Sequence, residues 1–298
     1  ININPDYPDA RHNLGNLFLN LGDLERAKMS FQEAIVIDSS HAGAHFNLGR
    51  VFEQLGEQES AILSYKNATK SKGNYVMAYA KLAILFQQRG WLNDAVLNLK
   101  KMLVLNPVYG LAYNTIGVIF SRQAKLFYSL INLARSLACD PTDKNTYNSI
   151  GNSLTKVSFN KPLPLIERAI LHLLRSKIPT SPILLSQAIS SLLRCKSNIL
   201  KILKSAHLID KCNAAKLIEI LIELNNTELV KEFMPISPWA DMEFEELLKK
   251  IRSSILLHYS QLSESIEAQD FAVTLALHCF TNEYVYGETA SETKALKS

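Results

Sequence analysis

Polar side chains recur at intervals of 34 residues in the first half of the chain. Asn13, Asn47 and Lys81 form one such row, and further amide or cationic side chains follow within two helical turns. Amides at fixed spacing can hydrogen-bond the backbone of an extended peptide whatever its sequence. A solvated groove that merely tolerates Asn is the alternative, and the sequence leaves both interpretations open. The candidate binding residues are Asn13, Asn16, Asn20, Asn47, Arg50, Gln54, Lys81, Gln88, Asn114 and Arg122.

Other arrangements that could do chemistry are weak. The chain has no G-x-G-x-x-G, P-loop, H-E-x-x-H or G-x-S-x-G motif. His41 and His45 are four residues apart, but no Cys or second His pair lies nearby, so we expect no metal site. Glu245 and Glu246 precede an apolar run and suit the first turn of a helix better than a catalytic dyad. We therefore expect no catalytic residue and no cofactor within this chain.

The polar rows belong to a repeat of 34 residues. Copies align at residues 13–34, 47–68, 81–102 and 115–136, the last being the least regular. An apolar column holds Leu14, Leu48, Leu82 and Ile116, and an aromatic column holds Phe18, Phe52, Phe86 and Phe120. Gly15, Gly49, Ala83 and Gly117 form a small-residue column that allows a second helix to approach closely. Each copy therefore predicts two antiparallel helices.

Glycine and proline mark the helix ends of this pattern. Gly22, Gly56 and Gly90 are expected to end the first helices, where a positive φ suits glycine. Pro107 and Pro141 are expected to stop the second helices.

This pattern resembles the tetratricopeptide repeat. The resemblance covers residues 9–141, with a fading fifth first helix at 147–154 and the tail of an upstream repeat ending at Pro5. It implies an all-α, right-handed superhelical solenoid whose first helices line a concave groove for a protein or peptide partner. The groove is rich in amides rather than Lys, which disfavours the repeat type that clamps a C-terminal carboxylate with several cations.

Beyond residue 160 the repeat register is lost, and an irregular helical region follows. Helices are expected near 163–176, 182–194, 197–206, 212–224, 243–261 and 266–283, with a non-helical link at 235–239. We divide the chain into a solenoid over residues 1–156, a helical linker region over 157–234 and a C-terminal helical region over 235–298.

The net charge of +4 hides an asymmetry in this second half. Residues 161–216 hold ten Lys and Arg against two acidic residues, and residues 217–298 hold six against fourteen. No aromatic residue interrupts the basic stretch, so a base-stacking surface is missing and nucleic acid is not an expected partner. Intramolecular neutralisation or plainly solvated faces explain the asymmetry better.

Compartment follows from what the sequence lacks. No run of 18 apolar residues and no signal-peptide pattern is present, so we expect neither a membrane span nor export. Cys139, Cys195, Cys212 and Cys279 are far apart and fall in helical patterns, which is typical of reduced thiols in a cytoplasmic protein.

The string "CFTNEYVY" at residues 279–286 carries a second resemblance. It is similar to the middle segment of a bacterial family in which tetratricopeptide repeats precede an S-adenosylmethionine-dependent methyltransferase domain. The chain departs from that family in Gly287 and in a tail containing Ser and Ala. The resemblance implies a non-catalytic, partner-recruiting part of a larger bacterial enzyme, with S-adenosylmethionine bound by a following domain.

Three alternatives stay open at this point. The repeats could serve a protein glycosyltransferase, which also takes substrate chains in Asn-lined grooves, or a scaffold without any catalytic domain. The string itself could be a terminal amphipathic helix packed on the helix before it.

Overall fold

The computed structural model describes residues 7–176, 182–237, 239, 241–262 and 265–281 of the chain. Within these residues the regular elements are all helices, and no strand is present. The chain divides into two compact units, residues 1–119 and 120–298. The predicted all-α solenoid with a following irregular helical region is confirmed.

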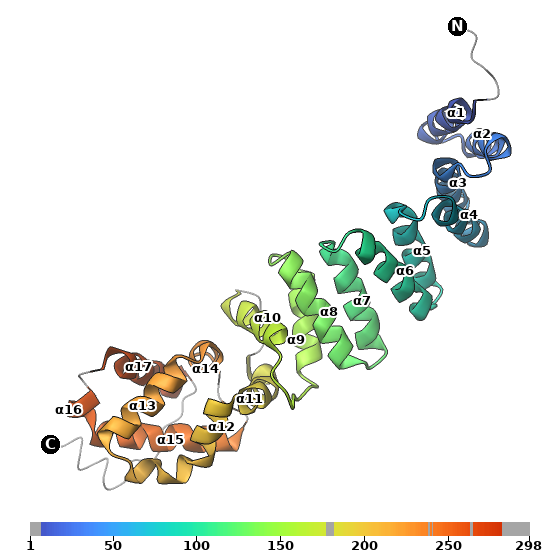
Figure 1. The fold of residues 1–298 in the computed structure, drawn as a ribbon. Helices are drawn as coiled ribbons and strands as arrows, with labels where there is room; N and C mark the ends of the chain where they lie inside the picture. The colour runs from blue at the N-terminus through green and yellow to red at the C-terminus, as the bar shows by residue number, and fades with distance from the viewer. Residues whose placement is uncertain (1–6, 177–181, 238, 240, 263–264, 282–298) are drawn as a thin grey trace. The chain divides into compact units, whose positions relative to one another are not determined.

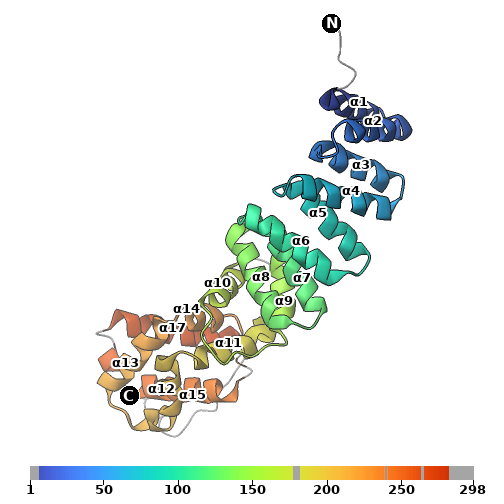
Figure 2. The ribbon, with the colours of Figure 1, turned by 45° about the vertical axis from the view of Figure 1, so that its right-hand side comes forward.

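The first unit is a stack of antiparallel helix pairs in chain order (Figures 1 and 2). Each pair packs on itself and on the next, α2 on α3 and α4 on α5. Its helices are α1 (Pro8–Asn20), α2 (Leu24–Ile37), α3 (Ala42–Gln54), α4 (Gln58–Ser71), α5 (Val76–Gln88), α6 (Leu92–Leu105) and the start of α7 (Gly110–Arg122).

A glycine and an aromatic ring meet at the centre of the first two pairs. A Cβ atom added to Gly15 would lie 2.6 Å from the Phe31 ring, and one added to Gly49 would lie 2.7 Å from the Tyr65 ring. Both rings are fully buried. The small-residue column therefore makes room for a side chain of the second helix, rather than for its backbone alone.

The turn glycines adopt the expected backbone conformation. Gly22, Gly56 and Gly90 have φ values of 77°, 78° and 76°, in the region that L residues disfavour. The equivalent residue one repeat later is Ala124, and it takes the same left-handed conformation with φ of 56°. The fourth turn keeps this geometry with a residue that is less suited to it.

The second unit is built from helices of unequal length, from 4 to 16 residues, that pack with less regularity (Figure 1). Its larger helices are α8 (Leu126–Cys139), α9 (Lys144–Leu154), α10 (Pro164–Arg175), α13 (Ala214–Asn225), α15 (Met242–Leu257) and α17 (Ile266–Thr281). The shorter elements are η1 (Pro182–Leu185), α11 (Ser186–Arg194), α12 (Ser197–Lys204), η2 (Ala206–Lys211), α14 (Glu228–Phe233) and α16 (Tyr259–Leu262).

One hydrophobic core runs through the second unit, from Leu130 on α8 to Leu275 on α17. At its centre the Trp239 ring stacks on Phe244, with 4.6 Å between ring centroids, and meets the edge of Phe233 at 4.9 Å. The backbone amide of Trp239 donates to Glu245 Oε1 at 2.8 Å. The described part of the expected non-helical link at 235–239 thus supplies a core residue as well as a connection.

The basic and acidic segments of this unit meet in part. Arg194 lies 2.7 Å from Asp241 and 2.6 Å from Glu243, and Arg175 lies 2.8 Å from Glu232. The basic residue in each pair comes from 161–216 and the acidic residue from 217–298. Several charges of the two segments therefore neutralise each other across the second unit.

Other expectations concern boundaries, thiols and membranes. The proposed divisions at 156, where the repeat pattern fades, and at 234, where the helical linker region ends, lie inside the second unit and remain predictions. All four cysteines are free. Among the helices of the described residues, none combines the length and apolar character that crossing a bilayer requires.

Most of the string at 279–286, from residue 282 onward, lies outside the described residues.

Candidate functional site

The first helices of the first unit bring most of the candidate residues into equivalent positions. Each helix contributes the same positions of its repeat, so the side chains form rows across the stack. These are Asn13, Asn16 and Asn20 on α1, Asn47, Arg50 and Gln54 on α3, and Lys81 and Gln88 on α5. Asn114 follows on α7, while Arg122, at the end of α7, belongs to the second unit.

Asn47 connects α1 to α3 through its side-chain amide. Its Nδ2 donates to Asn16 Oδ1 at 2.7 Å and to His12 Nε2 at 3.0 Å. Its Oδ1 accepts from Arg50 Nη1 at 3.2 Å. Because both amide hydrogens are used, Asn47 holds its neighbours in place and has no donor left over for a ligand.

Lys81 is held by a carboxylate that sequence reasoning missed. Its Nζ lies 2.9 Å from Glu53 Oε2, which joins α5 to α3. The buried Tyr65 hydroxyl also donates to Glu53. Burial, and then the nearby Glu53, raise the pKa of Tyr65 well above its usual range, so the hydroxyl keeps its proton and remains a donor. The charge of Lys81 is therefore matched within the protein.

Arg50 sits in a different environment from Lys81. Arg50 is half-buried as a residue, Asn47 orients its guanidinium, and its positive charge acts on Tyr65 and Tyr75. Burial raises the pKa of Tyr75, and the Arg50 charge works against that rise. The Phe46 ring lies between these two tyrosines, with centroids 5.4 Å and 5.1 Å away. Arg50 thus lies beside an aromatic cluster.

The remaining candidates form the periphery of the site. Asn13, Asn20, Gln54 and Gln88 are exposed, and Asn114 is half-buried. The amide of Asn13 is exposed where its equivalent Asn47 packs against a preceding first helix. In the described residues no helix precedes α1. The prediction that this surface binds a peptide therefore depends on these exposed amides.

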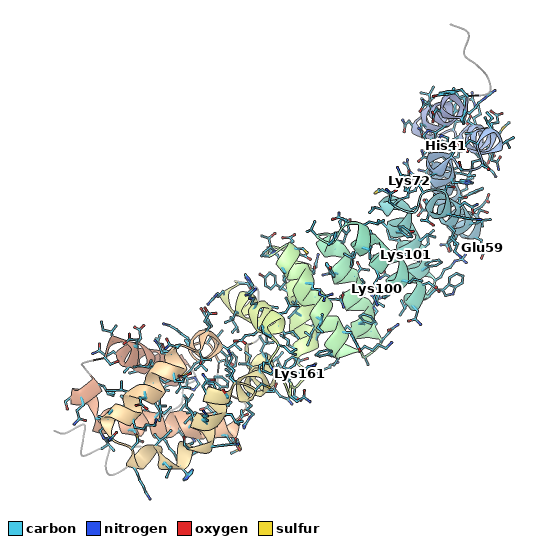
Figure 3. The ribbon with its side chains drawn as sticks, viewed as in Figure 1. His41, Glu59, Lys72, Lys100, Lys101 and Lys161 are labelled. Atoms are coloured by element: carbon cyan, nitrogen blue, oxygen red, sulfur yellow. The ribbon has the colours of Figure 1, made fainter. Side chains whose placement is uncertain are left out.

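A group of histidines extends the site at the junction of α1 and α3, and one of them, His41, is labelled in Figure 3. His41 Nδ1 accepts from the backbone amide of Ala44 and so caps α3, while its Nε2 lies 3.0 Å from Asp9 Oδ1. Hydrogen bonds from His41 and then Tyr7 hold the pKa of Asp9 below its usual range. Burial, and then the neighbouring His41, lower the pKa of His12. A neutral His12 suits its role as acceptor from Asn47.

The two histidines considered as metal ligands, His41 and His45, form hydrogen bonds within the protein instead. His45 Nε2 lies 3.0 Å from the carbonyl oxygen of Ser39, and both His41 nitrogens are engaged. Among the described residues, no group of three or more His, Cys, Asp or Glu side chains could hold a metal ion. These rings stabilise the loop before α3.

His12, Glu53 and Tyr65 are the site residues that sequence reasoning missed. His12 lies four residues before Asn16, and Glu53 lies three residues after Arg50, so helical spacing could have placed both on the face. Their importance comes from hydrogen bonds and an ion pair to residues on other helices, which spacing within one helix does not predict. The site as a whole offers exposed amides and one oriented guanidinium, which is the chemistry of recognition by hydrogen bonds and charge.

Comparisons with known proteins identify the repeats. The family described as "TPR repeat" matches residues 15–56, and the one described as "Tetratricopeptide repeat" matches residues 42–75. Residues 15–75 carry tetratricopeptide repeats. A comparison with curated proteins finds no match.

Several solved structures are similar to the chain. YrrB, described as a TPR protein with an unusual peptide-binding site, is 19% identical with a TM-score of 0.48, over 57% of this chain and 84% of YrrB. PilF from Pseudomonas aeruginosa is 18% identical with a TM-score of 0.43, over 89% and 96% of the two chains. MamA from Desulfovibrio magneticus is 16% identical with a TM-score of 0.45, over 55% and 90%.

Proposed function

We propose that the chain is a non-catalytic binding module that holds an extended segment of a protein partner across α1, α3 and α5. The observation that carries this proposal is the chain of side-chain hydrogen bonds from Asn16 through Asn47 to Arg50. These bonds fix the Arg50 guanidinium among exposed amides. Such hydrogen bonds hold the binding surface in one conformation before the partner binds. Less side-chain conformational entropy is then lost on binding.

The proposal is tested by cross-linking from two positions. A photo-reactive residue at Gln54, on the proposed surface, is compared with one at the exposed Lys100 on α6 (Figure 3). We expect partner peptides to attach at Gln54 and not at Lys100. Equal attachment at both positions would contradict the proposed surface.

The second step measures the attached partner by calorimetry. Replacing Asn13 by Ala removes an amide that faces the partner, and replacing Asn47 by Ala releases Asn16 and Arg50 from the hydrogen bonds that hold them. The double variant should therefore bind more weakly by roughly 1–3 kcal/mol in total, since a hydrogen bond is worth about 1 kcal/mol. Glu59→Ala, an exposed change on α4, is the control and should leave affinity unchanged. Undiminished binding by the double variant would mean that these amides do not contribute.

We further propose that the binding module is the recruiting part of a larger, cytoplasmic bacterial methyltransferase. The support is the string at residues 279–286, together with the absence of a recognisable cofactor-binding motif in this chain. Only the start of the string is described: Cys279 is half-buried on α17, and burial raises its pKa, which keeps the thiol protonated.

This wider context has its own test. The gene is sequenced beyond the codon for Ser298, and any longer product is purified and titrated with S-adenosylmethionine. We expect the longer protein to bind the cofactor and residues 1–298 alone not to bind it. A reading frame that stops soon after Ser298, or cofactor binding by residues 1–298, would contradict the methyltransferase context and leave the binding module standing.

A further inference from the structure

The surface formed by the first helices changes character along the stack. On α1 it presents the amides of Asn13, Asn16 and Asn20, and on α3 it presents Arg50. On α5, Ile84 stands at the position equivalent to Arg50, and Met77 lies two turns before it; their side chains are 48% and 59% exposed. A ligand that crosses the stack therefore meets hydrogen-bonding groups, then a cation, then an apolar surface.

Arg50 is the cation that remains open to a ligand. Among the described residues no carboxylate lies within 4 Å of its guanidinium, whereas Lys81 is paired with Glu53 at 2.9 Å. A ligand carboxylate could therefore form charge-assisted hydrogen bonds with the Arg50 guanidinium without competing with a carboxylate among the described residues. Asn47 binds one edge of Arg50, which fixes the direction of its remaining donors.

The apolar part of the surface is continuous across two repeats. Met77 and Ile84 lie seven residues apart and so share one face of α5. Leu111, the residue equivalent to Met77 on the next first helix, is 62% exposed. Large exposed apolar side chains at equivalent repeat positions match a partner that brings an apolar side chain to them.

The spacing of the helices limits the spacing of the ligand groups. Packed helices lie about 8–10 Å apart, and an extended chain advances about 3.3–3.6 Å per residue. The ion pair between Lys81 and Glu53 shows that α3 and α5 are neighbours. Two or three residues of extended peptide therefore carry a side chain from Arg50 to the row of Met77 and Ile84.

We propose that this surface selects an extended peptide in which an acidic side chain lies two or three residues from a large apolar side chain. The carboxylate binds Arg50, the apolar side chain packs on Met77 and Ile84, and the amides of α1 hold the peptide backbone. This inference rests on the proposed function and names the class of segment that the same site takes.

The experiment is a selection of displayed random twelve-residue peptides on the full 298-residue chain. The peptides are fused at both ends, so a binder cannot use a free terminal carboxylate. We expect enriched peptides to share Asp or Glu two or three positions from Leu, Ile, Met or Phe. Enrichment of no peptide at all would overturn the proposed function. Enrichment of peptides without this pair would overturn only the specificity inferred here.

Variants assign the two halves of the motif. Arg50→Gln should bind the selected peptide, synthesised with acetylated and amidated ends, at least tenfold more weakly than the parent, and Arg50→Lys should recover part of the loss. The double variant Met77→Ser, Ile84→Ser should bind the selected peptide more weakly than the parent protein does. A second peptide, in which the apolar residue is replaced, should bind the parent protein and this double variant equally.

Two controls keep these results unambiguous. Lys100→Ala, an exposed change on α6 outside the proposed surface, should change affinity by less than about threefold, and thermal melting confirms that each variant is folded. A selected peptide that binds Arg50→Gln as tightly as the parent would overturn the assignment of the carboxylate to Arg50.

Discussion

The two units solve the same problem, burying the apolar faces of short helices, in different ways. In the first unit each pair packs on itself and on the next pair, and the same two positions meet in successive repeats, Gly15 with Phe31 and Gly49 with Tyr65. In the second unit one core joins α8 to α17, and α13 packs on α17 across a long stretch of sequence. Contacts that are local in sequence allow local opening, whereas a shared core makes its helices unfold together.

The largest expected effect separates local from shared stability. Phe31→Ala and Phe244→Ala each remove a fully or nearly fully buried ring and should each cost about 3–5 kcal/mol. Hydrogen exchange followed by mass spectrometry should show faster exchange confined to α1–α4 for Phe31→Ala. For Phe244→Ala the amides of α8 through α17 should all exchange faster. Loss of protection confined to α15 in the second variant would contradict the shared core.

The next effect tests the match between glycine and ring. Gly49→Ala places a methyl group against the Tyr65 ring and should lower the free energy of unfolding by about 1–3 kcal/mol. The third repeat holds Ala83 and Leu99 at these two positions, both buried. Adding Tyr65→Leu to Gly49→Ala should therefore cost less than the sum of the two single changes in chemical denaturation. Simple additivity would show that the two positions do not compensate each other.

A smaller effect compares the turns of the two units. Gly90→Ala should destabilise the first unit by about 1–2 kcal/mol, because alanine is strained at a φ of 76° and no neighbouring atom would obstruct the added methyl group. Ala124→Gly, at the equivalent turn with φ of 56°, should stabilise the second unit by up to about 1 kcal/mol. Melting curves check both signs. Destabilisation by Ala124→Gly would mean that the fourth turn tolerates alanine without strain.

The smallest effect is a pH dependence confined to the first unit. Burial holds the pKa of His12 below 6.5, so near pH 6 the unfolded chain binds more protons at this residue than the folded chain does. The stability contributed by neutral His12 is present above pH 6.5 and is lost as the pH falls toward the lowered pKa. His12→Gln can still accept from Asn47 without titrating. Its melting temperature should therefore fall less than that of the parent between pH 7.5 and 5.5, and an equal fall would contradict this role.

The sequence predicts the repeats in detail because their contacts repeat with their residues. The positive φ at Gly22, Gly56 and Gly90 follows from one pattern seen three times. In the second unit most helices were predicted from amphipathic runs, but the six-residue α14 was missed. Its partners could not be predicted either. Arg194 and Asp241 are 47 residues apart, and composition shows only that opposite charges exist to be paired.

The sequence predicts which residues of the candidate site share a helix face, but not which of them contact each other. Spacing placed Asn16, Asn47 and Arg50 on one surface, since helical periodicity depends on sequence alone. Which amide is used internally and which cation is paired depends on neighbouring helices. Thus Lys81 and Arg50 look alike in the sequence, yet Glu53 pairs with Lys81 and leaves Arg50 without a carboxylate among the described residues.

Tyr65 gives the second repeat a property that its surface residues do not reveal. Its ring fills the space beside Gly49 as Phe31 fills the space beside Gly15, yet its hydroxyl also holds Glu53, the partner of Lys81. One oxygen atom in the interior therefore helps to decide which cation on the surface is neutralised. An engineer who wished to change what this surface attracts, while leaving every solvent-facing residue in place, could begin from inside the protein.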